Sequence, residues 1–83
     1  MATGTKPRWT DKLARPVRDA VDDVTILTRA DARTYLTELP EGRARSAQWQ
    51  VAARLLLEGE QADSVTRAIE LALMYEARLD LKC

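Results

Sequence analysis

Histidine is absent from this chain of 83 residues, and its single cysteine, Cys83, is the last residue. Without histidine the chain lacks the side chain that ordinarily titrates near neutral pH and serves as general base. One cysteine cannot form a disulfide within the chain or complete a structural zinc site. The three glycines, Gly4, Gly42 and Gly59, are too scattered to form a phosphate-binding loop. We therefore predict that the chain is not an enzyme and holds no cofactor or metal.

Long apolar runs are also missing from the sequence. None approaches the roughly 18 residues that a membrane-spanning helix needs. The basic residues near the N-terminus are not followed by the apolar segment of a signal peptide. Together with the lack of disulfides, these absences predict a cytoplasmic protein without membrane contact.

The charges cancel over the whole chain but are distributed unevenly. Residues 1–18 carry five basic residues and one acidic residue, a net charge of +4, so residues 19–83 carry a net charge of −4. We predict a flexible basic arm over residues 1–15 and a single helical domain over residues 16–83. The arm either docks on an acidic body, its own or a neighbour's, or binds nucleic acid. We favour docking, because an acidic body weakens binding to phosphates.

Apolar residues recur at helical spacing along most of the chain, which predicts an all-α fold. We expect a compact bundle of three to four helices with an extended basic N-terminal arm. A first helix over residues 16–24 begins at Pro16, whose missing N–H is not needed at that position. A second helix follows Thr28, which forms a near capping box with Asp31. Pro40 ends this helix, because it cannot donate a backbone hydrogen bond.

The second half of the chain predicts two longer helices. The third runs from about residue 45 to residue 58, and Gly59 follows it because glycine readily adopts the left-handed conformation. The fourth runs from about residue 63 to residue 80. Trp49 is in phase with the apolar stripe of the third helix, which predicts a buried core residue.

The third and fourth helices carry more apolar residues than one buried face requires. A chain this short builds only a small core, and oligomerisation is one means of supporting it. We therefore predict a non-enzymatic interaction or regulatory module that forms a homo-oligomer or binds another protein. Trp9 fits two roles equally, as a hook that holds the arm to the body or as an exposed docking residue. The predicted interface consists of Trp9, Leu55, Leu57, Leu71, Met74 and Tyr75.

The alternative prediction is a small nucleic-acid-binding regulator that uses the arm and the third helix. Arginine and glutamine are the side chains that read guanine and adenine in the major groove. Against this, the linker that begins at Pro40 has at least five residues, whereas a helix-turn-helix joins its helices by about three or four. The polar side chains also do not share one helix face. In this alternative the contacts come from Lys6, Arg8, Lys12, Arg15, Arg43, Gln50 and Arg54.

The stretch DARTYLTELPEGRARSAQWQVAARLLLEG, from Asp31 to Gly59, resembles a pattern in small uncharacterised helical bacterial proteins. In those proteins a D-A-x-x-Y-L-x-x-L-P segment is followed, after a short spacer, by x-W-Q-x-A-x-x-x-L-L. The resemblance covers about a third of the chain. It implies a small helical protein with no known activity, and it supplies no catalytic residues.

Overall fold

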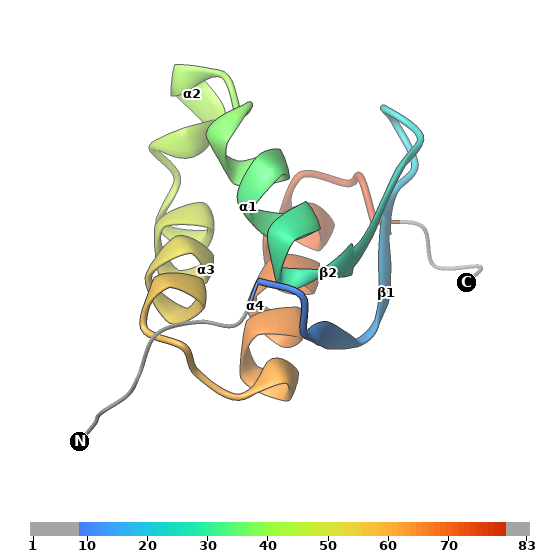
Figure 1. Ribbon diagram of the computed structural model, residues 1–83. Helices are drawn as coiled ribbons and strands as arrows, with labels where there is room; N and C mark the ends of the chain where they lie inside the picture. Colours follow the sequence, from blue (N-terminus) through green and yellow to red (C-terminus); the bar gives the residue numbers. More distant parts are fainter. Residues whose placement is uncertain (1–8, 80–83) are drawn as a thin grey trace.

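The computed structural model describes residues 9–79, and over this range the fold is α+β (Figure 1). A hairpin of two antiparallel strands comes first, formed by β1 (Lys12–Asp19) and β2 (Val24–Thr28). Four helices follow within this range: α1 (Arg29–Thr37), α2 (Glu41–Ala44), α3 (Ala47–Leu57) and α4 (Ala62–Tyr75). The prediction of an all-α bundle is therefore wrong.

The error lies in the first predicted helix, over residues 16–24. This segment forms the end of β1, a turn and the start of β2. Val17 is buried and pairs with Ile26 across the hairpin, and β-branched side chains of this kind pack well on a pleated surface. Val21, which the helical pattern placed on the buried face, is 60% exposed in the turn.

The turn between the strands is organised by Asp19. Its Oδ1 accepts hydrogen bonds from the backbone N–H groups of Val21, at 2.9 Å, and Asp22, at 3.2 Å. An aspartate that bonds the backbone just after it favours a turn over a helix. Asp23 completes the reversal in the left-handed region, with φ of 57°.

Strand pairing is regular from Val17 to Asp19 and irregular between Lys12 and Val17. Pro16 lies in the irregular part, which suits a residue that cannot donate to a strand ladder. Residues 12–15, which the sequence analysis assigned to the arm, thus belong to the hairpin. Residues 1–8 of the predicted arm, including Lys6 and Arg8, lie outside the described residues.

α4 lies between α3 and the hairpin, and α1 crosses over the core in front of it (Figure 1). The prediction for Trp49 is confirmed, because its side chain is only 1% exposed and contacts the ring of Tyr35, with 5.4 Å between ring centroids. The core draws on every element except α2. Its buried hydrophobic residues are Leu13, Val17, Ile26, Ala32, Tyr35, Trp49, Ala52, Leu56, Val65, Ala68, Ile69, Ala72 and Leu73.

The structure contains the second, third and fourth predicted helices as α1, α3 and α4, and it adds the short helix α2 in the predicted linker. Thr28 and Asp31 form the capping box with both of its hydrogen bonds. α1 ends before Pro40, and Gly59 follows α3 with φ of 72°. α4 ends at Tyr75, earlier than predicted, because the chain turns there and residue 79 forms a bridge to the end of β1. None of the helices in the described range is long and apolar enough to cross a membrane.

Candidate functional site

An apolar groove of about 410 Å³ runs between α3 and α4. Val51 and Leu55 line it from α3, and Ala68 and Leu71 line it from α4. Their positions follow from helical spacing, because residues three and four apart lie on one face of a helix. The remaining lining residues are Ala47, Gln48, Ser64 and Arg67. The groove therefore contains one charged side chain, Arg67, in an otherwise uncharged surface.

The exposed apolar surface extends along α4 beyond the groove. Leu71 and Met74 are each 53% exposed, and Tyr75 is 78% exposed. Val51 adds a further exposed apolar side chain from α3. We call this surface the α3–α4 face and define it as the groove residues together with Met74 and Tyr75. Exposed apolar side chains gathered in this way are characteristic of interaction surfaces.

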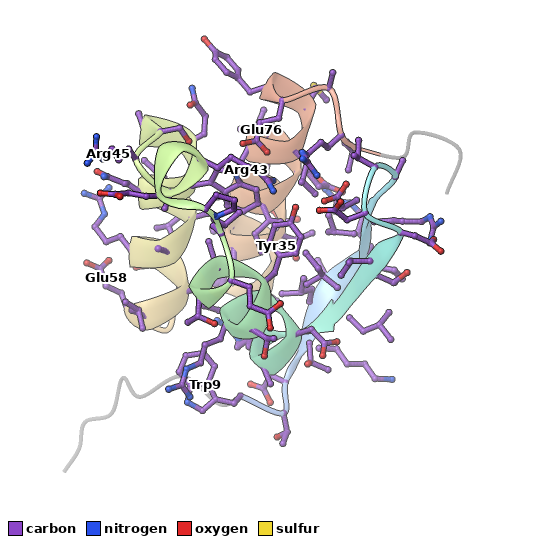
Figure 2. The ribbon with its side chains drawn as sticks, turned by 90° about the horizontal axis from the view of Figure 1, so that it is seen from above. Trp9, Tyr35, Arg43, Arg45, Glu58 and Glu76 are labelled. Atoms are coloured by element: carbon purple, nitrogen blue, oxygen red, sulfur yellow. The ribbon has the colours of Figure 1, made fainter. Side chains whose placement is uncertain are left out.

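Four of the six predicted interface residues, Leu55, Leu71, Met74 and Tyr75, belong to this face. Leu57 lies elsewhere, in a shallow depression that also includes Arg33 and Leu36 of α1. Trp9 lies beside α1, on the side away from α2 (Figure 2). It packs against the core, and the guanidinium of Arg33 lies 5.0 Å from its ring centroid. These contacts match the hook role, in which Trp9 holds the chain ahead of β1 to the body.

A second arrangement, which the sequence did not predict, is a network of charged side chains between the hairpin and the C-terminal end of α4. Its centre is Asp19, which is fully buried. The carboxylate accepts hydrogen bonds from the Tyr35 hydroxyl, at 2.5 Å, and from Nη1 of Arg78, at 3.0 Å. Tyr35 in turn accepts from Nη2 of Arg43 at 2.8 Å.

Arg43 continues the network to α4, and Figure 2 shows its side chain between Tyr35 and Glu76. Its guanidinium binds both oxygens of Glu76, with Nε at 3.0 Å and Nη2 at 2.7 Å. The guanidinium also lies over the rings of Tyr35 and Trp49, at 5.6 and 5.9 Å from their centroids. Such a bidentate, stacked arginine is geometrically fixed in a way that a lysine could not reproduce.

Each pKa shift in this network takes the pKa of the group further from neutral pH. Burial raises the pKa of Asp19, but hydrogen bonds from Tyr35, the backbone and Arg78 outweigh it and hold the pKa below the usual value. Glu76 behaves in the same way, because hydrogen bonds from Arg43 outweigh burial and lower its pKa. Burial and the bond to Asp19 raise the pKa of Tyr35 to about 12. A general acid or base works best with a pKa near the operating pH. Groups with pKa values this far from neutral are therefore better suited to a fixed structural network of charges.

The network predicts a specific pH dependence of stability. Because Asp19 and Glu76 have lowered pKa values in the folded state, the unfolded chain takes up protons first as the pH falls. Their contribution is therefore complete at neutral pH and is lost progressively below about pH 5. Tyr35 acts in the opposite sense, because its pKa is raised to about 12 from 10. Its contribution is complete below about pH 10 and is lost as the pH rises toward 12.

Urea denaturation at a series of pH values measures this dependence directly. The contribution of these groups to the free energy of unfolding should be constant between about pH 6 and pH 9. The free energy of unfolding should decrease below and above this range. Equal free energies of unfolding at pH 3 and pH 7 would contradict the account of Asp19 and Glu76.

A depression of about 400 Å³ opens beside the network, between the hairpin turn and α1. Tyr35, Arg43 and Arg78 line it, and both arginines are held by carboxylates. Asp22, Asp31 and Glu38 add acidic side chains to its wall. Within residues 9–79, no group of three or more His, Cys, Asp or Glu residues is placed to hold a metal ion.

Arg29 is a further buried cation that the sequence analysis did not single out. It begins α1, and its Nη2 donates a hydrogen bond at 2.5 Å to the carbonyl oxygen of Glu60, in the loop before α4. Its Nε and Nη1 are buried without a hydrogen-bond partner. Arg29 thus links the start of α1 to the α3–α4 loop, at the cost of leaving two donors unsatisfied.

The described members of the nucleic-acid set lie on three elements, β1, α2 and α3. Two of its arginines are neutralised by acidic side chains, Arg15 by Glu70 and Arg43 by Glu76. Lys12, Gln50 and Arg54 are exposed on β1 and α3. The described members of this set are therefore distributed over three elements, and two of them are already paired with carboxylates.

Comparisons with known proteins add no assignment to this geometry. The chain matches no family model, and neither the curated proteins nor the solved structures give a significant match.

Proposed function

We propose that this chain is a non-enzymatic interaction module that binds a second copy of itself through the α3–α4 face. The observation that carries the proposal is the exposure of Val51, Leu71, Met74 and Tyr75 around one apolar groove. Covering these side chains removes apolar surface from water, which favours association by about 25 cal/mol per Å² before the costs of binding.

The dimensions of the face fit a small dimer that dissociates on dilution. α4 has 14 residues, which corresponds to a helix about 21 Å long. Two packed helices present a surface roughly 20 Å wide. A flat patch of these dimensions covers about 420 Å² on each copy, or about 840 Å² in total, which is the size of a weak, transient interface and below the roughly 1,200–2,000 Å² of stable ones.

A second copy is favoured as the occupant by the charge of the chain. Its formal net charge is zero, so two copies approach without long-range repulsion. The groove offers only one charged side chain, Arg67, and therefore little that would select a strongly charged partner. A self-complementary apolar face is the usual basis of a two-fold symmetric dimer.

Light scattering across a dilution series tests the proposal. We expect the mass to approach twice that of the chain at high concentration and to fall toward the monomer mass on dilution. Raising the salt concentration should leave the midpoint nearly unchanged, because apolar burial is screened little by ions. A monomer at every concentration up to the millimolar range would overturn the proposal.

A further inference from the structure

Three exposed side chains of α4 lie in one row along its outer surface. Arg67, Leu71 and Tyr75 are spaced four residues apart, which places them on neighbouring turns of the same helix face. Leu71 is at the middle of the row, with the cation on one side and the aromatic ring on the other. Within the described part of the chain, Arg67 has no ion pair or hydrogen-bond partner, and Tyr75 is the most exposed of the large apolar side chains.

The order of this row distinguishes between the possible arrangements of two copies. In a parallel arrangement, Arg67 of one protomer lies at the level of Arg67 of the partner subunit, and the two cations repel each other. In an antiparallel arrangement the two-fold axis passes at the level of Leu71. A residue that precedes Leu71 by a given number of positions then lies level with the partner's residue that follows Leu71 by the same number. Arg67 of one protomer then lies level with Tyr75 of the partner subunit.

Antiparallel packing satisfies both of the otherwise unpartnered side chains. Arginine stacks favourably on an aromatic ring, with an attraction that grows when water is excluded. The two arginines are then separated by eight residues of helix, or about 12 Å along the axis. The same symmetry places Met74 level with the partner's Ala68, a small side chain that lines the groove.

Resting on the proposed function, we infer that two copies pack α4 against α4 in antiparallel orientation, with Leu71 at the two-fold axis and Arg67 stacked on Tyr75 of the partner subunit. Arg67 is then the residue that determines the orientation, because it penalises the parallel alternative. The apolar side chains supply most of the affinity.

Cysteine cross-linking tests this arrangement in the full chain after Cys83→Ser removes the only native thiol. A residue on a two-fold axis meets its own copy, and a disulfide forms only when two Cα atoms lie about 4.4–6.8 Å apart. We expect Leu71→Cys to form a disulfide dimer rapidly under mild oxidation. Ser64→Cys, which leaves Arg67 and Tyr75 in place and lies on the same face, should cross-link at least about tenfold more slowly, because its two copies lie about 21 Å apart along antiparallel helices.

A mixture of Ala68→Cys and Met74→Cys chains, distinguished by mass, supplies a second readout that leaves Arg67 and Tyr75 in place. We expect the mixed disulfide to form faster than either like pair. This readout does not require a substitution at Leu71, so it remains decisive if Leu71→Cys weakens the dimer. Leu57→Cys serves as a matched control for random collisions, since Leu57 is exposed but lies outside the α3–α4 face.

The possible outcomes separate this inference from the proposed function. Rapid cross-linking at residue 71, together with preferred pairing of residues 68 and 74, supports the inference. A dimer in which Ser64→Cys cross-links as fast as Leu71→Cys overturns the antiparallel arrangement and leaves the proposed function standing. A chain that stays monomeric before oxidation and cross-links at residue 71 no faster than at residue 57 overturns both.

Discussion

Replacement of Asp19 by alanine is expected to lower the free energy of unfolding by about 3–5 kcal/mol, the cost of breaking a buried, hydrogen-bonded ion pair. Asp19 is fully buried and accepts hydrogen bonds from Tyr35, Arg78 and two backbone N–H groups of the turn. Without Asp19, the Tyr35 hydroxyl and Nη1 of Arg78 lose this acceptor. The two hydrogen bonds that hold the turn are lost as well.

The size of this effect is large relative to the stability of so small a domain. A chain of 83 residues is ordinarily stable by about 4–12 kcal/mol. Asp19→Ala should therefore remove a large part of the free energy of unfolding, as measured by urea denaturation followed by circular dichroism. Asp19→Asn should have an intermediate effect, because the amide oxygen still accepts from the turn while the charge that pairs with Arg78 is lost.

Asp22→Ala is the matched control for this experiment. Asp22 contacts the same arginine, with 3.1 Å between its Oδ2 and Nη1 of Arg78, but its side chain is 56% exposed. Ion pairs of that kind contribute at most about 1 kcal/mol. If Asp19→Ala and Asp22→Ala lower the free energy of unfolding equally, the account of Asp19 as the centre of the network is wrong.

Asp19 also shows why the fold class could not be predicted from the sequence. The spacing of Val17, Val21 and Val24 fits a helix, and the local preference of Asp19 for a turn is too weak to outweigh that pattern. The hairpin depends on partners that are distant in sequence, namely Tyr35, 16 residues later, and Arg78, 59 residues later. Tertiary contacts of this range override a local pattern, and a single sequence does not reveal them.

Signals that are local in the chain predicted α1, α3 and the start of α4. The capping box at Thr28 and Asp31 and the glycine after α3 involve residues within one turn of each other. Trp49 was placed in the core from its spacing alone, because the apolar stripe of α3 spans three turns. The end of α4 was missed, since it is set by the return of the chain to β1 rather than by a stop signal.

The candidate interface was predicted in part. A surplus of apolar residues on the last two helices identified Leu55, Leu71, Met74 and Tyr75, but spacing within a helix does not show which neighbour covers each face. Leu57 therefore entered the set although it faces the α1 side of α3. Arg67 was not singled out, because its significance depends on two facts that only the structure shows: it lines the groove, and it belongs to the exposed row of α4.

Leu71→Asp is expected to abolish self-association, which is the largest functional effect that the structure predicts. The substitution places two carboxylates against each other at the centre of the proposed interface, where they would be desolvated without partners. Central apolar anchors of this kind contribute about 2 kcal/mol or more, so the dissociation constant should rise by at least about 30-fold. The fold should be retained, because Leu71 is about half exposed in the monomer.

Leu57→Asp is the matched control, since it makes the same substitution at an exposed leucine outside the α3–α4 face. Circular dichroism of both variants verifies that each remains folded. The two substitutions add the same charge to the same chain. Any difference in self-association between the two variants is therefore due to the position of the substitution and not to net charge.

The most direct test of the central claim is light scattering of the native chain, Leu71→Asp and Leu57→Asp at one concentration at which the native chain is dimeric. The account predicts a dimer for Leu57→Asp and a folded monomer for Leu71→Asp. A folded Leu71→Asp chain that remains as dimeric as the native chain, or equal dissociation of the two variants, would contradict the assignment of the α3–α4 face as the interface.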